Sequence, residues 1–223
     1  MLKDSTPPLR KDAAINRERL LAAATELFAE QGLDVTLNDI AHHAGVGVGT
    51  AYRRFANKEE IIDALFEQRL QAVADIAQEA LDDLDVWNGL ITYLDRTLYM
   101  RLGNRGLDQM MNNPGLGDER ASEARDRIAP IITKLVKKAQ KQGVIRQDLD
   151  QSDLIFIQQA LSAIGETTRE LSPQLYRRYL AIFLDGIKSD RANLTALPVR
   201  ALTASETHLA MTRRRRGVPT SHR

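Results

Sequence analysis

The residues of this chain whose types and spacing can do chemistry lie together in residues 36–55, TLNDIAHHAGVGVGTAYRRF. Four small residues, 47–50, stand just before the hydroxyl group of Tyr52 and the guanidinium groups of Arg53 and Arg54. Hydroxyl and guanidinium groups donate hydrogen bonds to phosphate oxygens or to the acceptor edge of guanine. Small residues let a backbone approach its partner closely. The chemistry indicated is therefore non-covalent recognition of a nucleic acid rather than catalysis.

Two short helices are predicted to position these groups. Thr36 and Asp39 have the spacing of a capping box, which begins the first helix, and Gly45 permits the sharp turn that follows it. The second helix is expected over about 47–54. Two short helices joined by such a turn are typical of a helix-turn-helix, whose second helix enters the major groove of DNA. This arrangement predicts double-stranded DNA as a partner.

The predicted DNA contacts fall into two groups. Val48 and Thr50 can contact a thymine methyl group. Thr36 and Lys58 each lie at a helix N-terminus, where free amides and the helix dipole favour a phosphate. A tight helical corner without function is the alternative, but the helix before this stretch and Asn57 to Glu59 after it favour the DNA interpretation. The predicted DNA-binding residues are Thr36, Val48, Gly49, Thr50, Tyr52, Arg53, Arg54 and Lys58.

Composition limits the other functions. The chain has no cysteine, so it can form neither a disulfide nor a thiolate metal site. His42 and His43 are adjacent and cannot share a metal on one helix face, and no nucleotide-binding loop or nucleophile elbow is present. We therefore expect no enzyme, no metal and no cofactor. Without a signal sequence or an apolar run of about 18–20 residues, we expect a cytoplasmic protein and no membrane partner.

The net charge of +1 is unevenly distributed. Residues 1–58 carry +1, residues 59–190 carry −6, and residues 191–223 carry +6. Because the acidic middle repels phosphate, DNA binding must depend on a few locally placed cations. The arginines at 213–216 are either a solvated tail or a source of salt-sensitive DNA affinity.

The periodicity of apolar residues predicts an all-α protein. An N-terminal three-helix domain with a helix-turn-helix is joined by a long helix to a C-terminal helical domain for ligand binding and dimerisation. Pro130 is expected to kink its helix. We expect a flexible arm at 1–11, the DNA-binding domain at 12–57, the effector-binding and dimerisation domain at 58–190 and a disordered basic tail at 191–223. Beyond the helix-turn-helix, helices are expected over 13–31, 57–83, 86–103, 106–111, 118–142, about 152–171 and about 173–189.

Residues 14–66 resemble the N-terminal domain of the TetR (tetracycline-repressor-like) family. This resemblance implies an all-helical homodimeric repressor that a small molecule releases from a palindromic operator. Gly47, Val48 and Ala51 depart from the residues that members often have there, which affects the operator sequence expected. The matching residues are Leu20, Ala23, Ala24, Leu27, Phe28, Gly32, Thr36, Ile40, Ala41, Ala44, Gly45, Val46, Gly49, Tyr52, Phe55, Lys58 and Glu59.

The last two predicted helices are apolar on more than one side, so they are expected to be buried on more than one side. One side can pack against a second copy as a four-helix bundle around a twofold axis, where the resemblance also places the dimer. Burial within a single protomer is the alternative. The predicted dimer interface comprises Leu154, Ile157, Leu161, Ile164, Tyr179, Phe183 and Ile187.

Methionine and aromatic residues in the middle helices can line an adaptable ligand pocket or simply fill a core. Glu166 is either a polar group of that pocket or the partner of Arg169 at i, i+3. We expect a ligand-released homodimeric repressor; the alternatives are an effector-independent architectural DNA-binding protein and a helical protein that binds other proteins. The predicted pocket residues are Trp87, Tyr93, Leu98, Met110, Met111, Ile131 and Glu166.

Overall fold

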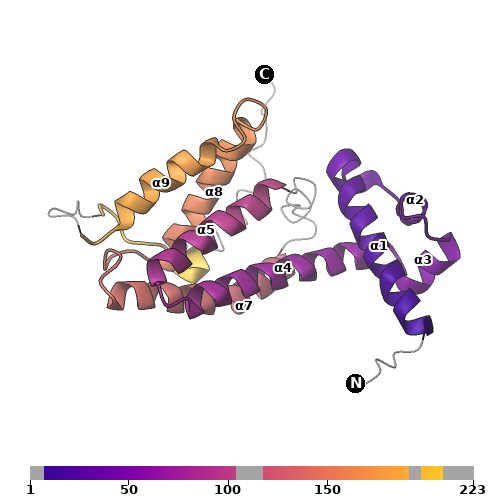
Figure 1. The fold of residues 1–223 in the computed structure, drawn as a ribbon, viewed down its shortest axis with the longest axis horizontal. Coiled ribbons are helices and arrows are strands. Elements are labelled where there is room, and N and C mark those ends of the chain that lie inside the picture. Colours follow the sequence, from indigo (N-terminus) through magenta and orange to yellow (C-terminus); the bar gives the residue numbers. More distant parts are fainter. Residues whose placement is uncertain (1–7, 104–117, 191–196, 208–223) are drawn as a thin grey trace, which may run out of the picture. The chain divides into compact units, whose positions relative to one another are not determined.

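The computed structural model describes residues 8–103, 118–190 and 197–207. Within these ranges the elements are helical, as predicted, apart from one isolated bridge between Ile145 and Lys188 (Figure 1). The helices are α1 (Pro8–Gln31), η1 (Gly32–Asp34), α2 (Leu37–His43), α3 (Val48–Arg54), α4 (Lys58–Asp82), α5 (Val86–Gly103), α7 (Asp118–Lys141), α8 (Gln151–Thr167) and α9 (Leu175–Ile187).

The chain forms two compact units, and α4 contributes to both. The first unit contains α1, α2, α3 and the start of α4 as far as Arg69. The second unit contains the rest of α4 from Leu70, together with α5, α7, α8 and α9. The predicted boundary between residues 57 and 58 falls at the start of α4, so the first turns of this helix belong to the DNA-binding unit.

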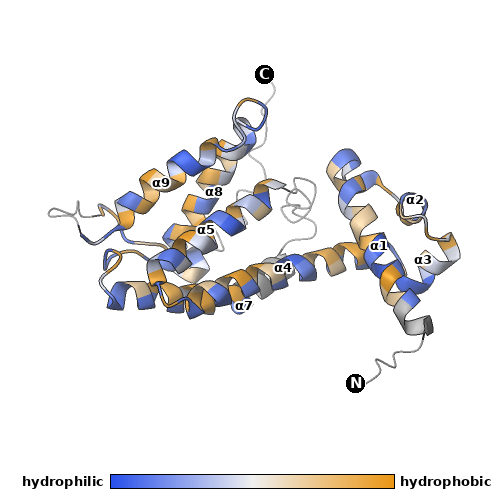
Figure 2. Ribbon diagram, in the orientation of Figure 1, coloured by the Kyte–Doolittle hydropathy of each residue, from blue (hydrophilic) through white to orange (hydrophobic). Residues whose placement is uncertain are grey.

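Each unit has an apolar core that its helices share. In the first, α1 buries Leu20, Ala24 and Phe28 at helical spacing, and α2 and α3 add Ile40 and Ala51. Apolar and polar bands alternate along the helices of both units (Figure 2). The core of the second unit includes Leu90, Leu94, Leu98, Leu135, Ile145, Leu154, Leu161, Tyr176, Leu180 and Ile187.

Lys138 closes the end of α4. Its ammonium group donates hydrogen bonds to the carbonyl oxygens of Leu81, at 2.8 Å, and Asp83, at 2.7 Å. Carbonyl groups at a helix C-terminus lack partners within the helix, and a cation there also complements the helix dipole. This residue of α7 therefore fixes the last turn of α4.

Two helix boundaries differ from those predicted. Helix α1 begins at Pro8 rather than near residue 13, which proline permits because it fits the first turn of a helix. Helix α8 ends at Thr167 rather than near 171, and the amide of Ser172 then donates to the carbonyl of Thr168 at 2.7 Å. That turn uses Ser172, so α9 begins only at Leu175, after Gln174, rather than near residue 173 as predicted.

The predicted disordered tail also differs where the structure describes it. In residues 197–207, Glu206 accepts hydrogen bonds from Arg200 and from the amide of Thr203, and residues 204–207 form a helical turn. The predicted helix at 106–111 and the arginines at 213–216 lie outside the described residues. Pro130 lies inside α7, and a kink there stays a prediction. Among the described helices, none has the length and hydropathy needed to cross a membrane.

Candidate nucleic-acid interface

The first helix of the predicted helix-turn-helix begins with the expected capping box. The hydroxyl oxygen of Thr36 accepts a hydrogen bond from the amide of Asp39 at 3.2 Å, and the carboxylate of Asp39 accepts one from the amide of Thr36 at 2.9 Å. The hydroxyl of Thr36 also donates to this carboxylate at 2.6 Å. That bond, together with the one from the Thr36 amide, holds the pKa of Asp39 below its usual value. Gly45 then has a φ of 64°, a left-handed conformation that favours glycine, so the predicted turn is confirmed.

The second helix, α3, is anchored on one side and open on the other. Ala51 and Phe55 are buried against the unit's core, whereas Tyr52, Arg53 and Arg54 are exposed. Tyr52 is 51% exposed, so its hydroxyl group is accessible. The three polar side chains nearest the end of α3 are consequently free to meet an external partner.

The first turn of α3 leaves its backbone accessible. A Cβ atom added at Gly49 would have no neighbour within 4 Å, and one added at Gly47 would meet only the hydroxyl of Thr50, at 3.9 Å. One guanidinium nitrogen of Arg53 donates to the hydroxyl oxygen of Thr50 at 2.8 Å. This bond draws the arginine side chain towards the first turn, so Thr50 and Arg53 lie together.

Lys58 has a hydrogen-bond partner within the protein, besides the phosphate group predicted for it. Its ammonium group donates to the carbonyl oxygen of Leu33 at 2.5 Å and so ties the start of α4 to η1. An ammonium group has three donors, so two are left for a phosphate. Thr36 is exposed at the start of α2, as a phosphate contact requires.

Sequence reasoning missed two contacts that brace this unit. The guanidinium of Arg17 lies 5.6 Å from the centre of the Phe55 ring, which links α1 to the end of α3. His43 and Glu26 lie 2.8 Å apart and link α2 to α1. Neither pair is adjacent in sequence, and only the packing of the three helices brings them together.

The predicted pocket residues lie in different surroundings. Tyr93 and Leu98 are buried in the core of the second unit, and burial raises the pKa of Tyr93 to about 12. The ring of Trp87 lies 5.2 Å from the ammonium nitrogen of Lys188. Ile131 packs at the edge of the same core. Glu166 forms the ion pair with Arg169 that was weighed as the alternative, and Met110 and Met111 lie outside the described residues.

The predicted dimer residues differ in how far they are exposed. Leu154, Leu161 and Ile187 are buried within one protomer, in the core that α4, α5, α7, α8 and α9 share. Ile157, Ile164 and Phe183 are partly buried at the edge of that core. Tyr179 is 42% exposed, and Ile182, which the prediction left out, is 58% exposed.

Two family models match separate parts of the chain. Residues 20–65 match bacterial regulatory proteins of the tetR family, and residues 87–189 match the C-terminal domain of SbtR-like transcriptional regulators. A crystal structure of a TetR transcription regulatory protein from Mycobacterium vanbaalenii is 30% identical, with a TM-score of 0.60. The match covers 81% of this chain and 99% of that one. The chain belongs to the TetR family.

Two further regulators are similar to the chain, over different shares of its length. The structure of a TetR transcriptional regulator from Streptomyces coelicolor is 27% identical, has a TM-score of 0.62, and is matched over 78% of this chain and 99% of that one. An HTH-type transcriptional regulator of Staphylococcus aureus is 31% identical over 45% of this chain and 56% of that protein. The chain thus spans about half the length of the curated relatives it matches.

Membership assigns a general role to the surface built above. The protein is a DNA-binding transcriptional regulator of a family that is not enzymatic. Its helix-turn-helix is α2 and α3, and all of it lies inside the matched residues 20–65. The exposed end of α3 therefore lies in the helix-turn-helix of a DNA-binding family.

Proposed function

We propose that this TetR regulator is a homodimeric repressor that binds a palindromic operator and is released from it by a small molecule. The observation that carries the dimer is an apolar stripe on the outer side of α9. Leu175, Tyr179, Ile182 and Gly186 recur at intervals of four, three and four residues, so they lie on one face of the helix.

This stripe supports self-association because of its regular spacing. Isolated exposed apolar side chains are normal on a monomer and need no explanation. Here Tyr179 and Ile182, both large and substantially exposed, are neighbours on the same helix face. Two such faces related by a twofold axis bury each other, and a twofold protein matches a palindromic site.

Release by a ligand would act through α4. This helix supplies residues to both compact units, so it is the element through which a change in the second unit would reach the first. A ligand can shift the operator-binding equilibrium only by as much as its affinity differs between the bound and released states. The second unit, which holds the C-terminal part of α4, is where that difference would arise.

Selection from a random duplex pool tests the operator, at about 150 mM salt so that phosphate-only binding is suppressed. We expect an enriched palindrome with half-sites about one or two helical turns apart. Arg54→Ala should weaken binding, and Thr50→Val should change the base preference of each half-site. An enriched site without symmetry, bound by one protomer, would contradict the proposal.

Light scattering of an α9 variant tests the dimer separately. Ile182→Asp places a charge in the proposed interface and should shift the protein to monomers. Leu84→Asp is the matched control, because Leu84 is 96% exposed and belongs to the turn between α4 and α5, outside the stripe. A dimer that survives Ile182→Asp, or one that Leu84→Asp dissociates to the same extent, would place the interface elsewhere.

A further inference from the structure

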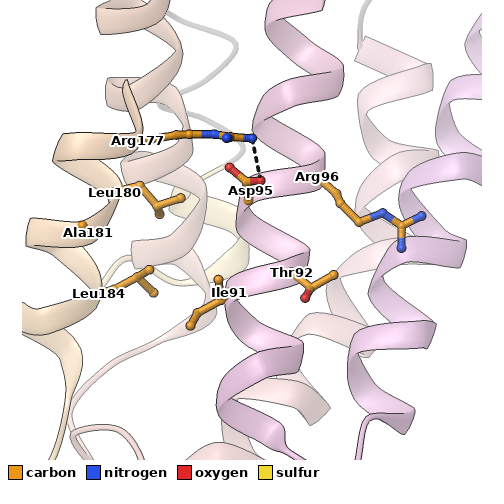
Figure 3. Close-up of a pocket in the computed structure, with 8 residues that line it drawn as sticks. All are labelled: Ile91, Thr92, Asp95, Arg96, Arg177, Leu180, Ala181 and Leu184. Carbon is orange, nitrogen blue, oxygen red and sulfur yellow. Dashed lines mark hydrogen bonds and ion pairs between the residues drawn. The ribbon is translucent and has the colours of Figure 1, made fainter. Parts of the chain in front are cut away.

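A groove runs between α5 and α9 in the second unit (Figure 3). Its volume is about 380 Å³, which lies within the range of small-molecule sites. Ile91 of α5 and Leu180 and Leu184 of α9 form its apolar lining, and Asp95 and Arg177 form its polar end. The arrangement of an apolar lining with a polar group at one end suits an amphipathic molecule.

The polar end is preorganised. A guanidinium nitrogen of Arg177 lies 3.1 Å from a carboxylate oxygen of Asp95, and the two side chains point towards each other across the groove. The Nε atom of Arg177 also donates to the hydroxyl oxygen of Tyr176 at 3.3 Å. Holding a side chain in its binding geometry reduces the entropy lost when a ligand binds.

The charges of this pair select the head group of the ligand. Asp95 repels a carboxylate and Arg177 repels an ammonium group, whereas together they offer both acceptors and donors. Arg96, the other arginine of the groove, extends away from Arg177 (Figure 3) and pairs with Glu79 of α4. A neutral head that both donates and accepts hydrogen bonds, such as a primary amide, therefore fits best.

The groove stays accessible in the proposed dimer. Arg177, Ala181 and Leu184 lie on one side of α9, and Tyr179 and Ile182 lie on the opposite side, since each residue turns a helix by about 100°. A second copy seated on the apolar stripe would therefore leave the groove open.

The groove is also connected to α4. Arg96 lines it on α5 and forms an ion pair with Glu79, which lies in the part of α4 that belongs to the second unit. A molecule that separates α5 from α9 would strain this ion pair. The first turns of α4 belong to the DNA-binding unit, so strain at Glu79 would affect operator binding through this helix.

We propose that the groove between α5 and α9 is a regulatory site for neutral amphipathic molecules with a hydrogen-bonding head, an inference that rests on the proposed ligand-released function. Three compounds of equal chain length serve as probes: hexanamide, hexanoate and hexylamine. Titration of the full-length protein, followed by NMR, should show hexanamide binding at least fivefold more tightly than the two charged compounds.

Two variants localise the binding. Ala181→Phe fills the groove from an exposed position and should abolish hexanamide binding, whereas Arg178→Phe adds the same ring on the solvent side of α9 and should not. Arg177→Gln should weaken hexanamide binding and remove the discrimination against hexylamine. Hexanamide binding that Ala181→Phe leaves intact, or equal binding of all three compounds, would overturn the site.

Operator affinity separates this inference from the proposed function. Hexanamide at saturation should weaken operator binding by the wild type at least fivefold and leave Ala181→Phe unaffected, and by linkage the operator should weaken hexanamide binding by the same factor. Hexanamide binding with unchanged operator affinity would overturn the regulatory role. A protein that is monomeric in light scattering, or that selects no palindromic site, would instead contradict the proposed function.

Discussion

Gly89 packs its backbone directly against the end of α4, so replacing it should destabilise the second unit. It is a buried residue in the first turn of α5. A Cβ atom added there would lie 2.4 Å from the carbonyl oxygen of Ala80 and 3.2 Å from the Cβ atom of Asp83. The obstacle at Ala80 is backbone, which cannot move aside as a flexible side chain can.

The magnitude follows from the size of the overlap. A carbon atom normally stays about 3.3 Å or more from a carbonyl oxygen, so Gly89→Ala requires the two helices to separate by about 1 Å. Overpacking of this kind costs about 1–3 kcal/mol, and the better helix propensity of alanine offsets up to about 1 kcal/mol. We expect a net destabilisation of about 2 kcal/mol, because a backbone obstacle places the cost at the upper end of that range.

Trp87 provides the assay, since it is the single tryptophan of the chain and lies two residues before Gly89. Urea unfolding followed by its fluorescence should give a lower midpoint for Gly89→Ala with an unchanged slope. Gly103→Ala is the matched control: it lies at the exposed end of the same helix, and an added Cβ atom meets nothing within 4 Å. Free energies of unfolding within about 0.5 kcal/mol for the two variants would refute the reasoning, because about 2 kcal/mol is expected from the overlap.

Three further outcomes are expected. Thr36→Ala should destabilise the first unit by about 1 kcal/mol because it removes the cap of α2, and Thr36→Ser should restore most of that loss in thermal unfolding. Lys138→Met should destabilise the second unit by about 1–3 kcal/mol because two carbonyl groups at the end of α4 lose their donor; an unchanged urea midpoint would contradict this. Hydrogen bonds from Arg146 hold the pKa of Asp148 below its ordinary 3.8. The pair therefore stabilises the fold above pH 3.8, and this stabilisation is lost as the pH falls through the lowered pKa. Asp148→Asn should therefore flatten the acid limb of the stability profile, and an identical limb would assign acid unfolding to other carboxylates.

Local signals in the sequence were sufficient for most of the helices. The Thr36 and Asp39 box begins α2, Asp150 caps α8, and Gly45 and Gly143 have the positive φ expected after a helix. These features depend on hydrogen bonds between residues at most a few positions apart, so the sequence contains the information. The start of α9 was missed because the amide of Ser172 closes the turn after Thr168, so the helix begins only after Gln174.

Sites that depend on packing could not be predicted in the same way. Apolar periodicity showed that α8 and α9 are buried on several sides, but it could not show that Leu154 and Leu161 face their own protomer and Ile182 faces outwards. The pair of Asp95 and Arg177 is 82 positions apart in sequence, and each residue alone resembles an ordinary surface charge. The groove therefore became visible only in the folded chain.

The unbroken helix α4 also limits how the protein can change in length. Every residue in a helix advances the chain by about 1.5 Å and turns it by about 100°. A single residue inserted near position 69 would turn residues 70–82 of α4 by about 100° relative to residues 58–69, so the apolar faces that α4 presents to its two units would lose their relative phase. An insertion of seven residues nearly restores the phase but lengthens the helix by about 10 Å. In this segment, insertions and deletions should therefore be tolerated far less than substitutions, because only substitutions keep the length and the helical phase of α4.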